Sequence, residues 1–264
     1  MPADPTVRFD AVTVRRGGPD LLHSVDWVVH PHERWVVIGP NGSGKTTLLQ
    51  VVAGYLHPTS GTVDVLGSRL GRVDARELRR RIGMSSAAVS KMLRPEISVA
   101  DAVMTARHAA LEPWWHRYHD SDRQRARDLL ARAGLADAAD RPFGVLSEGE
   151  RQQVLLARTL MADVDLLIFD EPAAGLDFGA RERLVARLDD VARDGSSPPA
   201  LFVTHHVEEI PPSFTSALVL RRGSVVAAGP VDESITSEAL SEAFELPVRV
   251  SRIEGRFLAR ASRE

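Results

Sequence analysis

The residues best suited to chemistry form a glycine-rich segment with the sequence GPNGSGKTT. Its glycines allow the backbone to curl so that successive N–H groups face a single anion, and the positive end of a following helix adds to that field. In the pattern G-x-x-x-x-G-K-[ST], Lys45 reaches the β- and γ-phosphates of a nucleotide, and the hydroxyl of Thr46 is a ligand for Mg²⁺. The sequence therefore predicts a site for a nucleoside triphosphate with Mg²⁺. Its residues are Gly39, Pro40, Asn41, Gly42, Ser43, Gly44, Lys45, Thr46 and Thr47.

Two acids and a histidine follow other apolar runs. DLLIF leads into Asp170 and Glu171, and LFVT leads into His205. We expect Asp170 to hold Mg²⁺ through its water shell and Glu171 to orient or deprotonate the attacking water. His205 is expected to contact the γ-phosphate or to hold Glu171 and the water in place. The acid pair also fits a helix cap or a turn before Pro172, and the histidine also fits a polar strand end. The glycine-rich segment favours catalysis, because parallel strands that end side by side bring these residues together.

Short apolar strands must position these residues. Alternating apolar residues predict a strand over Val7–Val14, and a second strand covers roughly Val25–Val29. The run Trp35–Ile38 is apolar throughout, which is typical of a central parallel strand, and a helix is expected to begin near Lys45. Similar runs recur before the acid pair and at Leu201–Val203. Buried strands that alternate with helices predict a layered α/β domain with a mainly parallel sheet.

The middle of the chain has a helical pattern. Helix-period stretches cover Val99–Ala110 and Arg123–Ala133. We therefore expect residues 89–145 to be a helical subdomain inserted into a core formed by residues 1–88 and 146–264.

The last fifth of the chain is expected to start with two short strands split by Arg222-Gly223, after Thr215. A polar helix near Ser237–Phe244 and an Arg-rich tail follow.

Composition narrows the class of protein. The 264 residues are 44% hydrophobic and 26% charged, as in ordinary soluble globular proteins. The net charge of -3 argues against broad nucleic-acid affinity, and the lack of cysteine excludes disulfides and cysteine-ligated metals. No apolar run approaches the ~18 residues of a membrane span, and MPADPTVRFD lacks the layout of a signal peptide. We expect a cytoplasmic protein.

One more segment, LSEGERQ, carries a family resemblance. It resembles the LSGGQ signature of the ATP-binding cassette (ABC) family, with Glu148 and Glu150 in place of a glycine and the glutamine. Ser147 and Gly149 keep a hydroxyl and a bare backbone at a helix start, where Ser147 is the expected N-cap. The matching residues are Leu146, Ser147, Glu148, Gly149 and Glu150.

The resemblance implies a fold and a mechanism. The fold is a P-loop NTPase core with a mainly parallel sheet, an N-terminal antiparallel β portion and an inserted helical subdomain. Two chains pair head to tail, and the signature of one closes on the ATP bound by the other, which is hydrolysed with Mg²⁺. The segment AGLD, ending at Asp177, resembles the family's D-loop, and VTHH resembles its switch-histidine segment with His205 in the functional position.

The chain departs from the family pattern at two places. The family usually stacks an aromatic ring on adenine, and here Arg16 occupies the expected position. A guanidinium plane can also stack on a base, so we expect Arg16 to bind adenine with relaxed nucleotide selectivity. A glutamine normally follows the strand at Ile82–Met84. Ala87 is near its position, and Ser85 or Ser86 is a possible substitute.

The resemblance also implies partners. The leading hypothesis is the ATPase subunit of a transporter with separate membrane-spanning permease subunits, peripheral on the inner face of the cell membrane. The segment SEALSEAFELPVRV resembles the ends of importer ATPases of the ferric-siderophore, cobalamin and molybdate group. In importers the membrane subunit docks beside the helical subdomain, which would involve Trp114 and Trp115 here unless they serve local packing.

Two alternatives stay open. One is a non-transport ABC ATPase that acts on a ribosomal, nucleic-acid or regulatory partner. The missing glutamine supports it, whereas the single cassette, the lack of a coiled coil and the net charge of -3 disfavour it. The other is a nucleotide-binding module with little turnover, against which the residues of the predicted catalytic set argue.

Overall fold

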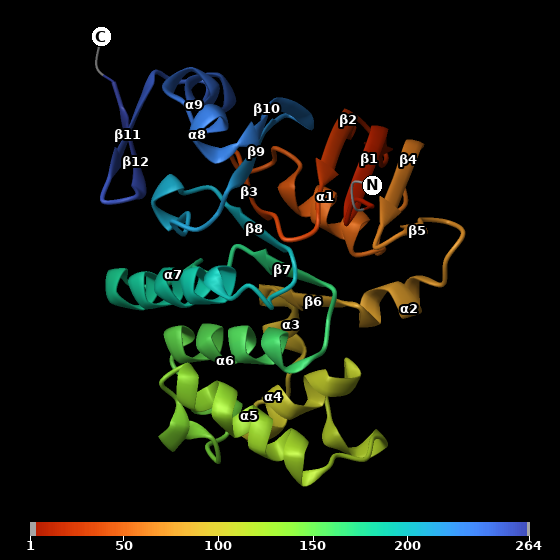
Figure 1. The fold of residues 1–264 in the computed structure, drawn as a ribbon, viewed down its shortest axis with the longest axis vertical. Helices are drawn as coiled ribbons and strands as arrows, with labels where there is room; N and C mark the ends of the chain where they lie inside the picture. The colour runs from red at the N-terminus through yellow and green to blue at the C-terminus, as the bar shows by residue number, and fades with distance from the viewer. Residues whose placement is uncertain (1–3, 263–264) are drawn as a thin grey trace.

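The computed structural model describes residues 4–262, except for the side chains of Ala87, Ala88 and Trp115. Two sheets make up one end of the elongated molecule and a group of helices makes up the other (Figure 1). Both the expected α/β core and the helical middle of the chain are present.

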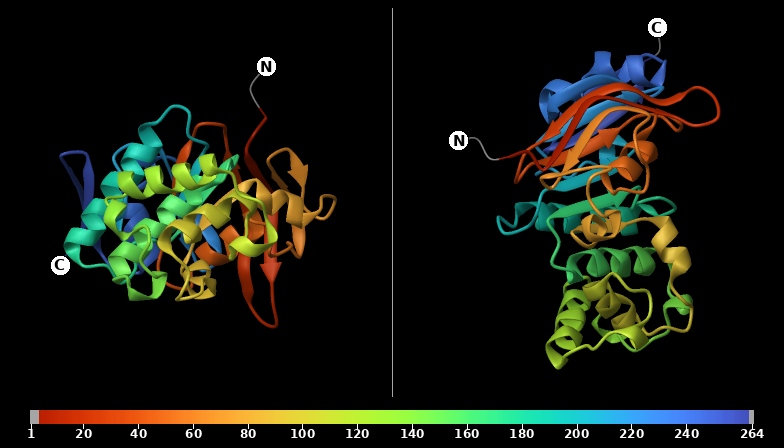
Figure 2. Two further views of the ribbon diagram at one scale, coloured as in Figure 1. Left: turned by 90° about the horizontal axis from the view of Figure 1, so that it is seen from below. Right: turned by 90° about the vertical axis from the view of Figure 1, so that its right-hand side faces the viewer.

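The N-terminal sheet is antiparallel and has the strand order β2-β1-β4-β5. Its strands are β1 Val7–Arg15, β2 Asp20–Val29, β4 Ser60–Val65 and β5 Ser68–Arg69. The second strand is longer than the sequence predicted, because its pairing with β1 continues to Arg15 and Asp20. The turn between these strands projects from the body of the sheet (red, Figure 2).

The central sheet has six strands in the order β10-β9-β3-β8-β7-β6, and the five from β9 to β6 are parallel to one another. They are β3 Arg34–Ile38, β6 Ile82–Ser85, β7 Leu166–Asp170, β8 Ala200–Thr204, β9 Ser216–Arg221 and β10 Ser224–Pro230. The order places β3, β8 and β7 side by side. The expected neighbourhood of the glycine-rich segment, the histidine and the acid pair is therefore confirmed.

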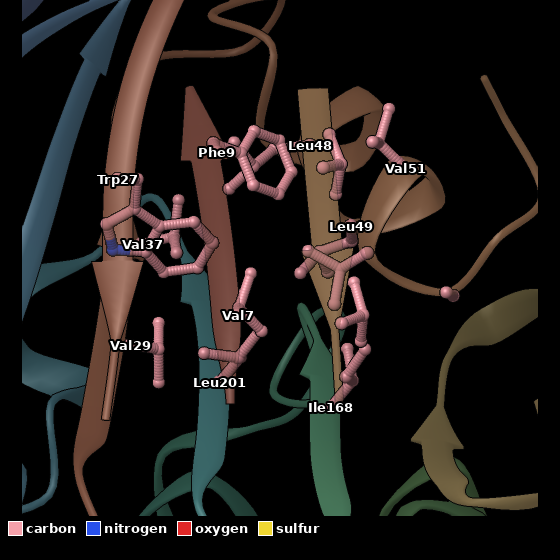
Figure 3. Packing of buried hydrophobic residues seen from close by; sticks show 14 of the residues in the cluster. Val7, Phe9, Trp27, Val29, Val37, Leu48, Leu49, Val51, Ile168 and Leu201 are labelled. Atoms are coloured by element: carbon pink, nitrogen blue, oxygen red, sulfur yellow. The ribbon is translucent and has the colours of Figure 1, made fainter. Parts of the chain in front are cut away.

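Alternate residues of the central strands face two separate apolar layers. Val37 packs with Phe9, Trp27 and helix α1 (Lys45–Val52) beneath the N-terminal sheet, as Figure 3 shows. Val36, on the other face, packs with helices α6 (Glu148–Met161) and α7 (Phe178–Arg193). Because both faces are covered, the middle residues of β3, β7 and β8 are all apolar.

The helical region contains α3 Ala87–Met92, α4 Val99–Met104 and α5 Asp120–Arg132, and α2 Ala75–Arg80 precedes it. The predicted helix over Val99–Ala110 is wrong at its end, because α4 stops at Met104 and a 3-10 turn over Thr105–His108 follows. The buried guanidinium of Arg158 donates to the carbonyl oxygens of Ala102 and Ala110, so one side chain binds backbone groups on both sides of this turn.

Helix α6 connects the helical region to the core. Its Leu156 belongs to the apolar layer of the central sheet, whereas Val154, Leu155 and Met161 pack with α4 and α5. The division at residues 145 and 146 therefore stays a prediction, since α6 contributes to both sides.

The C-terminal part begins with α8 Val231–Ser234 and α9 Ser237–Phe244, and α9 matches the predicted helix. The expected Arg-rich tail is instead a hairpin of β11 Val248–Ile253 and β12 Arg256–Ala261. Glu254 and Gly255 have φ values of 49° and 80°, which suit a two-residue hairpin turn. Among residues 4–262 no helix is long and apolar enough to cross a membrane.

Candidate nucleotide site

The glycine-rich segment joins the end of β3 to the start of α1. A Cβ atom on Gly39 would lie 2.2 Å from the carbonyl oxygen of Leu220 and 2.7 Å from Ser43 Oγ. Gly42 and Gly44 have φ values of 79° and 105°, which side chains other than glycine rarely adopt. The glycines are therefore required by a tight loop that turns directly into a helix.

Distant parts of the chain support this loop. Gly223, in the turn between β9 and β10, donates its N–H to the carbonyl oxygen of Ser43 at 2.9 Å. It accepts at its own carbonyl from the N–H of His23 on β2 at 2.8 Å. A Cβ atom on Gly44 would lie 2.8 Å from the carbonyl oxygen of Leu21. The sequence did not reveal Gly223 as a support, although Arg222-Gly223 was a visible turn signal.

Lys45 lies at the start of α1 with its side chain 4% exposed. Its ammonium group donates to the carbonyl oxygens of Gly39 at 2.8 Å and Pro40 at 3.1 Å. It also lies 3.7 Å from Glu171 Oε1. Burial lowers the pKa of Lys45, and the charge of Glu171 partly opposes this. The loop therefore directs one buried positive charge toward the acid pair.

The acid pair ends β7. Burial, together with the neighbouring charge of Glu171, raises the pKa of Asp170 to about 6 against the opposing charge of Lys45. Glu171 has a φ of 47°, and its N–H donates to the carbonyl oxygen of Val203 on β8 at 3.0 Å. A left-handed backbone at a bulky residue costs about 1 kcal/mol and is common at functional sites. It aims the Glu171 carboxylate at the neighbouring strand.

His205 follows β8, and its Nδ1 lies 3.4 Å from Glu171 Oε1. The loop after it is fixed by Thr204, whose hydroxyl donates to the carboxylate of the buried Glu209 and accepts the N–H of His206 at 3.0 Å. The sequence did not point to Glu209 as a support for the histidine. Lys45 at the start of α1, Glu171 just after β7 and His205 just after β8 thus form one line of contacts.

The residues present fit Mg²⁺ bound together with nucleotide phosphates. Thr46 is exposed at the first turn of α1, and Asp170 ends β7, which lies two strands from β3, the strand that precedes α1. Ser43 Oγ in the loop is buried without a hydrogen-bond partner. In residues 4–262 no three acidic or histidine side chains group closely enough to hold a metal alone. Mg²⁺ usually takes one or two protein ligands plus phosphate oxygens, as this donor set provides.

The register of β6 and β7 shows which residue lies where the family usually has its glutamine. Ser85 on β6 pairs with Phe169 on β7, so Ser86 comes level with Asp170. Ser86 is the residue before α3, and its side chain is 9% exposed. Of the three positions named from the sequence, Ser86 is therefore the one beside the acid pair.

The predicted signature begins α6, as expected. Ser147 is the N-cap, and its Oγ accepts the N–H of Glu150 at 3.3 Å. The Glu150 carboxylate accepts from the N–H and the hydroxyl of Ser147 at 2.7 Å and 2.8 Å. Arg141 lies 3.3 Å from Glu150, and Arg151 lies 3.7 Å from Glu148. The two acids that replace the family's residues are thus each paired with an arginine.

The signature opens onto a cavity of about 670 Å³. Ser147, Gly149 and Asp177 line it, and no residue of the loop 39–47 does. Asp177 is the N-cap of α7 and accepts the N–H of Ala180 at 2.7 Å. Arg16 is exposed in the turn between β1 and β2. The structure therefore gathers Lys45, Asp170, Glu171 and His205, and it keeps the signature at a separate cavity.

A family model described as ABC transporter matches residues 22–174, more than half of the chain. The chain belongs to the ABC transporter family. It is similar to the uncharacterized ABC transporter ATP-binding protein YlmA of Bacillus subtilis, at 40% identity over 97% of this chain and 97% of the relative. It is also similar to the hemin import ATP-binding protein HmuV of Nocardia farcinica, at 34% identity over 90% of this chain and 82% of the relative.

Solved structures show the same fold. One is cbiO1 from Clostridium perfringens, part of the transporter complex cbiONQ, with a TM-score of 0.77, 23% identity and coverage of 91% and 94% of the two chains. Another is a dimeric ATP-binding cassette in a post-hydrolysis state with ADP and Pi, with a TM-score of 0.73, 24% identity and coverage of 85% and 98%. The chain is thus an ABC ATPase, the ATP-binding subunit type of this family.

Proposed function

We propose that this ABC ATPase binds Mg-ATP at residues 39–47 and hydrolyses it with Glu171 as the base. The loop N–H groups and Lys45 bind the phosphates, and Thr46 and Asp170 hold Mg²⁺, which neutralises charge on the phosphates. Arg16 stacks on the adenine. The observation that carries the proposal is the 3.7 Å and 3.4 Å contacts of Glu171 Oε1 with Lys45 and His205.

Each contact has a chemical consequence. Lys45 at the start of α1 and His205 just after β8 approach the same carboxylate oxygen, so they restrict where Glu171 points. A carboxylate held in this way accepts a proton from a water in line with the γ-phosphate. The buried Lys45 charge lies where negative charge builds up on the phosphate oxygens, and burial strengthens that interaction.

We propose further that the active unit is a head-to-tail homodimer. The cavity at Ser147 contains no residue of the phosphate loop. A γ-phosphate that contacts both the phosphate loop and the signature must therefore lie between two chains. The N-terminus of the 14-residue helix α6 carries partial positive charge that suits such an anion. Asp177 lines the same cavity and would lie at the interface between the chains.

The wider function that we propose is to drive an importer. The support is the similarity to the hemin import proteins of Nocardia farcinica and Rhodococcus jostii and to a phosphonates import protein of Ruegeria sp., at 34%, 31% and 33% identity. The permease would be a separate chain, with this subunit in the cytoplasm on the inner face of the membrane. Trp114 is 66% exposed beside Arg94 and offers an apolar docking point on the helical region.

The test is to purify tagged Glu171→Gln protein from its native host after gentle membrane solubilisation. We expect a multi-span membrane protein to co-purify, and less of it with Trp114→Ala. Lys45→Ala is the control for nucleotide dependence. A wholly soluble protein, or one that carries ribosomal proteins, would contradict the importer proposal.

A further inference from the structure

The C-terminal hairpin lies against the loop that carries His205. Phe257 on β12 is 5% exposed and belongs to the same apolar cluster as Val207 and Ile210, which follow the histidine. Figure 1 shows β11 and β12 at the edge of the molecule, beyond the central sheet. A segment that the sequence suggested to be a tail therefore contacts the predicted catalytic region.

One side chain of this hairpin bonds to two elements of the core. The Arg256 guanidinium binds the Glu182 carboxylate with both terminal nitrogens, at 3.0 Å and 3.3 Å. One of these nitrogens also donates to the backbone carbonyl of Glu208. Glu182 lies in the first turns of α7, whose N-cap is Asp177. Glu208 lies in the loop that follows His205.

The loop is packed against the hairpin at Val207 and Ile210 but borders a cavity at its two histidines. The lining of this cavity of about 210 Å³ includes His205 and His206 as well as Ala259 of the hairpin. The Thr204 and Glu209 side chains join the two ends of the loop to each other. The contact from Arg256 at Glu208 joins the loop to the hairpin and, through Glu182, to α7.

We propose that Arg256 is a positioning residue for ATP hydrolysis. It holds the His205 loop and the beginning of α7 at a fixed spacing, so that His205 stays in reach of Glu171 while Asp177 faces the partner chain. This inference rests on the proposed roles of Glu171 and His205. It adds a residue that lies outside the nucleotide site and acts through two elements of that site.

The experiment compares steady-state ATP hydrolysis of Arg256→Ala with that of Arg252→Ala. The control residue is on the same hairpin, pairs with Asp232 and stacks on Phe257, but bonds neither core element. We expect kcat to fall about tenfold in Arg256→Ala with KM within about twofold, since a displacement of about 1 Å near the reacting groups is enough for that loss. The control should keep wild-type kcat. Arg256→Lys should fall between, because an ammonium keeps the charge but loses the two-pronged contact.

A second comparison separates positioning from general damage to the fold. In a His205→Ala background, measured by single-turnover hydrolysis, adding Arg256→Ala should change the rate less than about twofold. A tenfold loss that persists there would overturn the inference. If Arg256→Ala melts well below Arg252→Ala, Glu182→Gln serves instead, and unchanged kcat in that variant would also overturn it.

The proposed function is checked in the same series by Glu171→Gln. Retained turnover in that variant would contradict the proposed site whatever Arg256 does. Lost turnover in Glu171→Gln, together with equal kcat in Arg256→Ala and Arg252→Ala, would overturn only the role of Arg256.

Discussion

The phosphate loop and the signature are both helix N-termini, yet they are built in opposite ways. At the phosphate loop, α1 begins next to a buried Lys45, and backbone groups from β2 and the β9–β10 turn press on the loop glycines. At the signature, α6 begins at the surface, and the Glu150 carboxylate satisfies the N–H and the hydroxyl of Ser147. The phosphate loop is held in shape by backbone contacts from distant segments, whereas the signature is capped by the carboxylate of its own Glu150.

This difference indicates that the phosphate loop and the signature have different roles. A buried cation facing two carboxylates is poised for chemistry. The start of α6 is capped by its own side chains, and its two acids pair with Arg141 and Arg151. It is therefore stable in a single chain and exposed enough to contact a second chain. We therefore assign chemistry to the phosphate loop and closure of the dimer to the signature.

The largest difference is expected when one glutamate is changed at the phosphate-loop site and one at the signature. Glu171→Gln removes the proposed base and should lower kcat about 10²–10⁴-fold, the range for loss of general-base catalysis. Glu150→Gln keeps a capping-box residue at the signature and should lower kcat less than about tenfold. Phosphate release at saturating Mg-ATP measures both, and equal losses would contradict the division of work.

The tight loop predicts the next effect. Gly39→Ala places a Cβ atom 2.2 Å from the backbone oxygen of Leu220, so the loop must shift. We expect ATP affinity to fall about 10–100-fold, which corresponds to 1–3 kcal/mol of overpacking. Gly18→Ala is the matched control, because nothing lies within 4 Å of its Cβ position. Binding of a fluorescent ATP analogue measures both, and unchanged affinity in Gly39→Ala would argue against a rigid loop.

Pairing of the signature acids predicts a smaller effect. Arg141→Ala leaves the Glu150 charge less compensated where the γ-phosphate of the partner is expected. ATP-dependent dimerisation should weaken about threefold to fivefold, consistent with an exposed ion pair worth up to 1 kcal/mol. Adding Glu150→Gln should restore it. A double variant as weak as Arg141→Ala would show that this charge does not matter.

Removing a charge at the phosphate-loop site and at the signature should change the melting temperature in opposite directions. The pKa of Asp170 is raised to about 6, so above that pH its buried charge destabilises the fold, and this penalty fades as the pH falls toward 4. The pKa of Glu150 is lowered by its bonds to Ser147, so its charge stabilises the fold at neutral pH, and this gain is lost in acid. Without nucleotide near neutral pH, Asp170→Asn should raise Tm and Glu150→Gln should lower it, each by about 2–5 °C. Scanning calorimetry measures both, and shifts of the same sign would contradict the comparison.

The sequence predicted features that depend on short stretches of residues. The phosphate loop, the acid pair and the strands beneath them carry residue types that few other structures need, and their neighbourhood follows from parallel strands. Long-range supports were invisible: Gly223 reaches Ser43, and Arg256 reaches Glu208, across wide gaps in the sequence. The hairpin itself had a signal, since Val248 and Val250 alternate before a Glu-Gly turn, but the surrounding arginines concealed it.

Sedimentation of Glu171→Gln with and without Mg-ATP tests the central claim that the signature of one chain completes the ATP site of another. We expect a monomer without nucleotide and a dimer with it, because the variant binds ATP but does not release it by hydrolysis. Adding Ser147→Arg, which places a long side chain at the signature cavity, should return the protein to a monomer. A monomer in Glu171→Gln with saturating Mg-ATP, or a dimer that survives Ser147→Arg, would contradict the two-chain site.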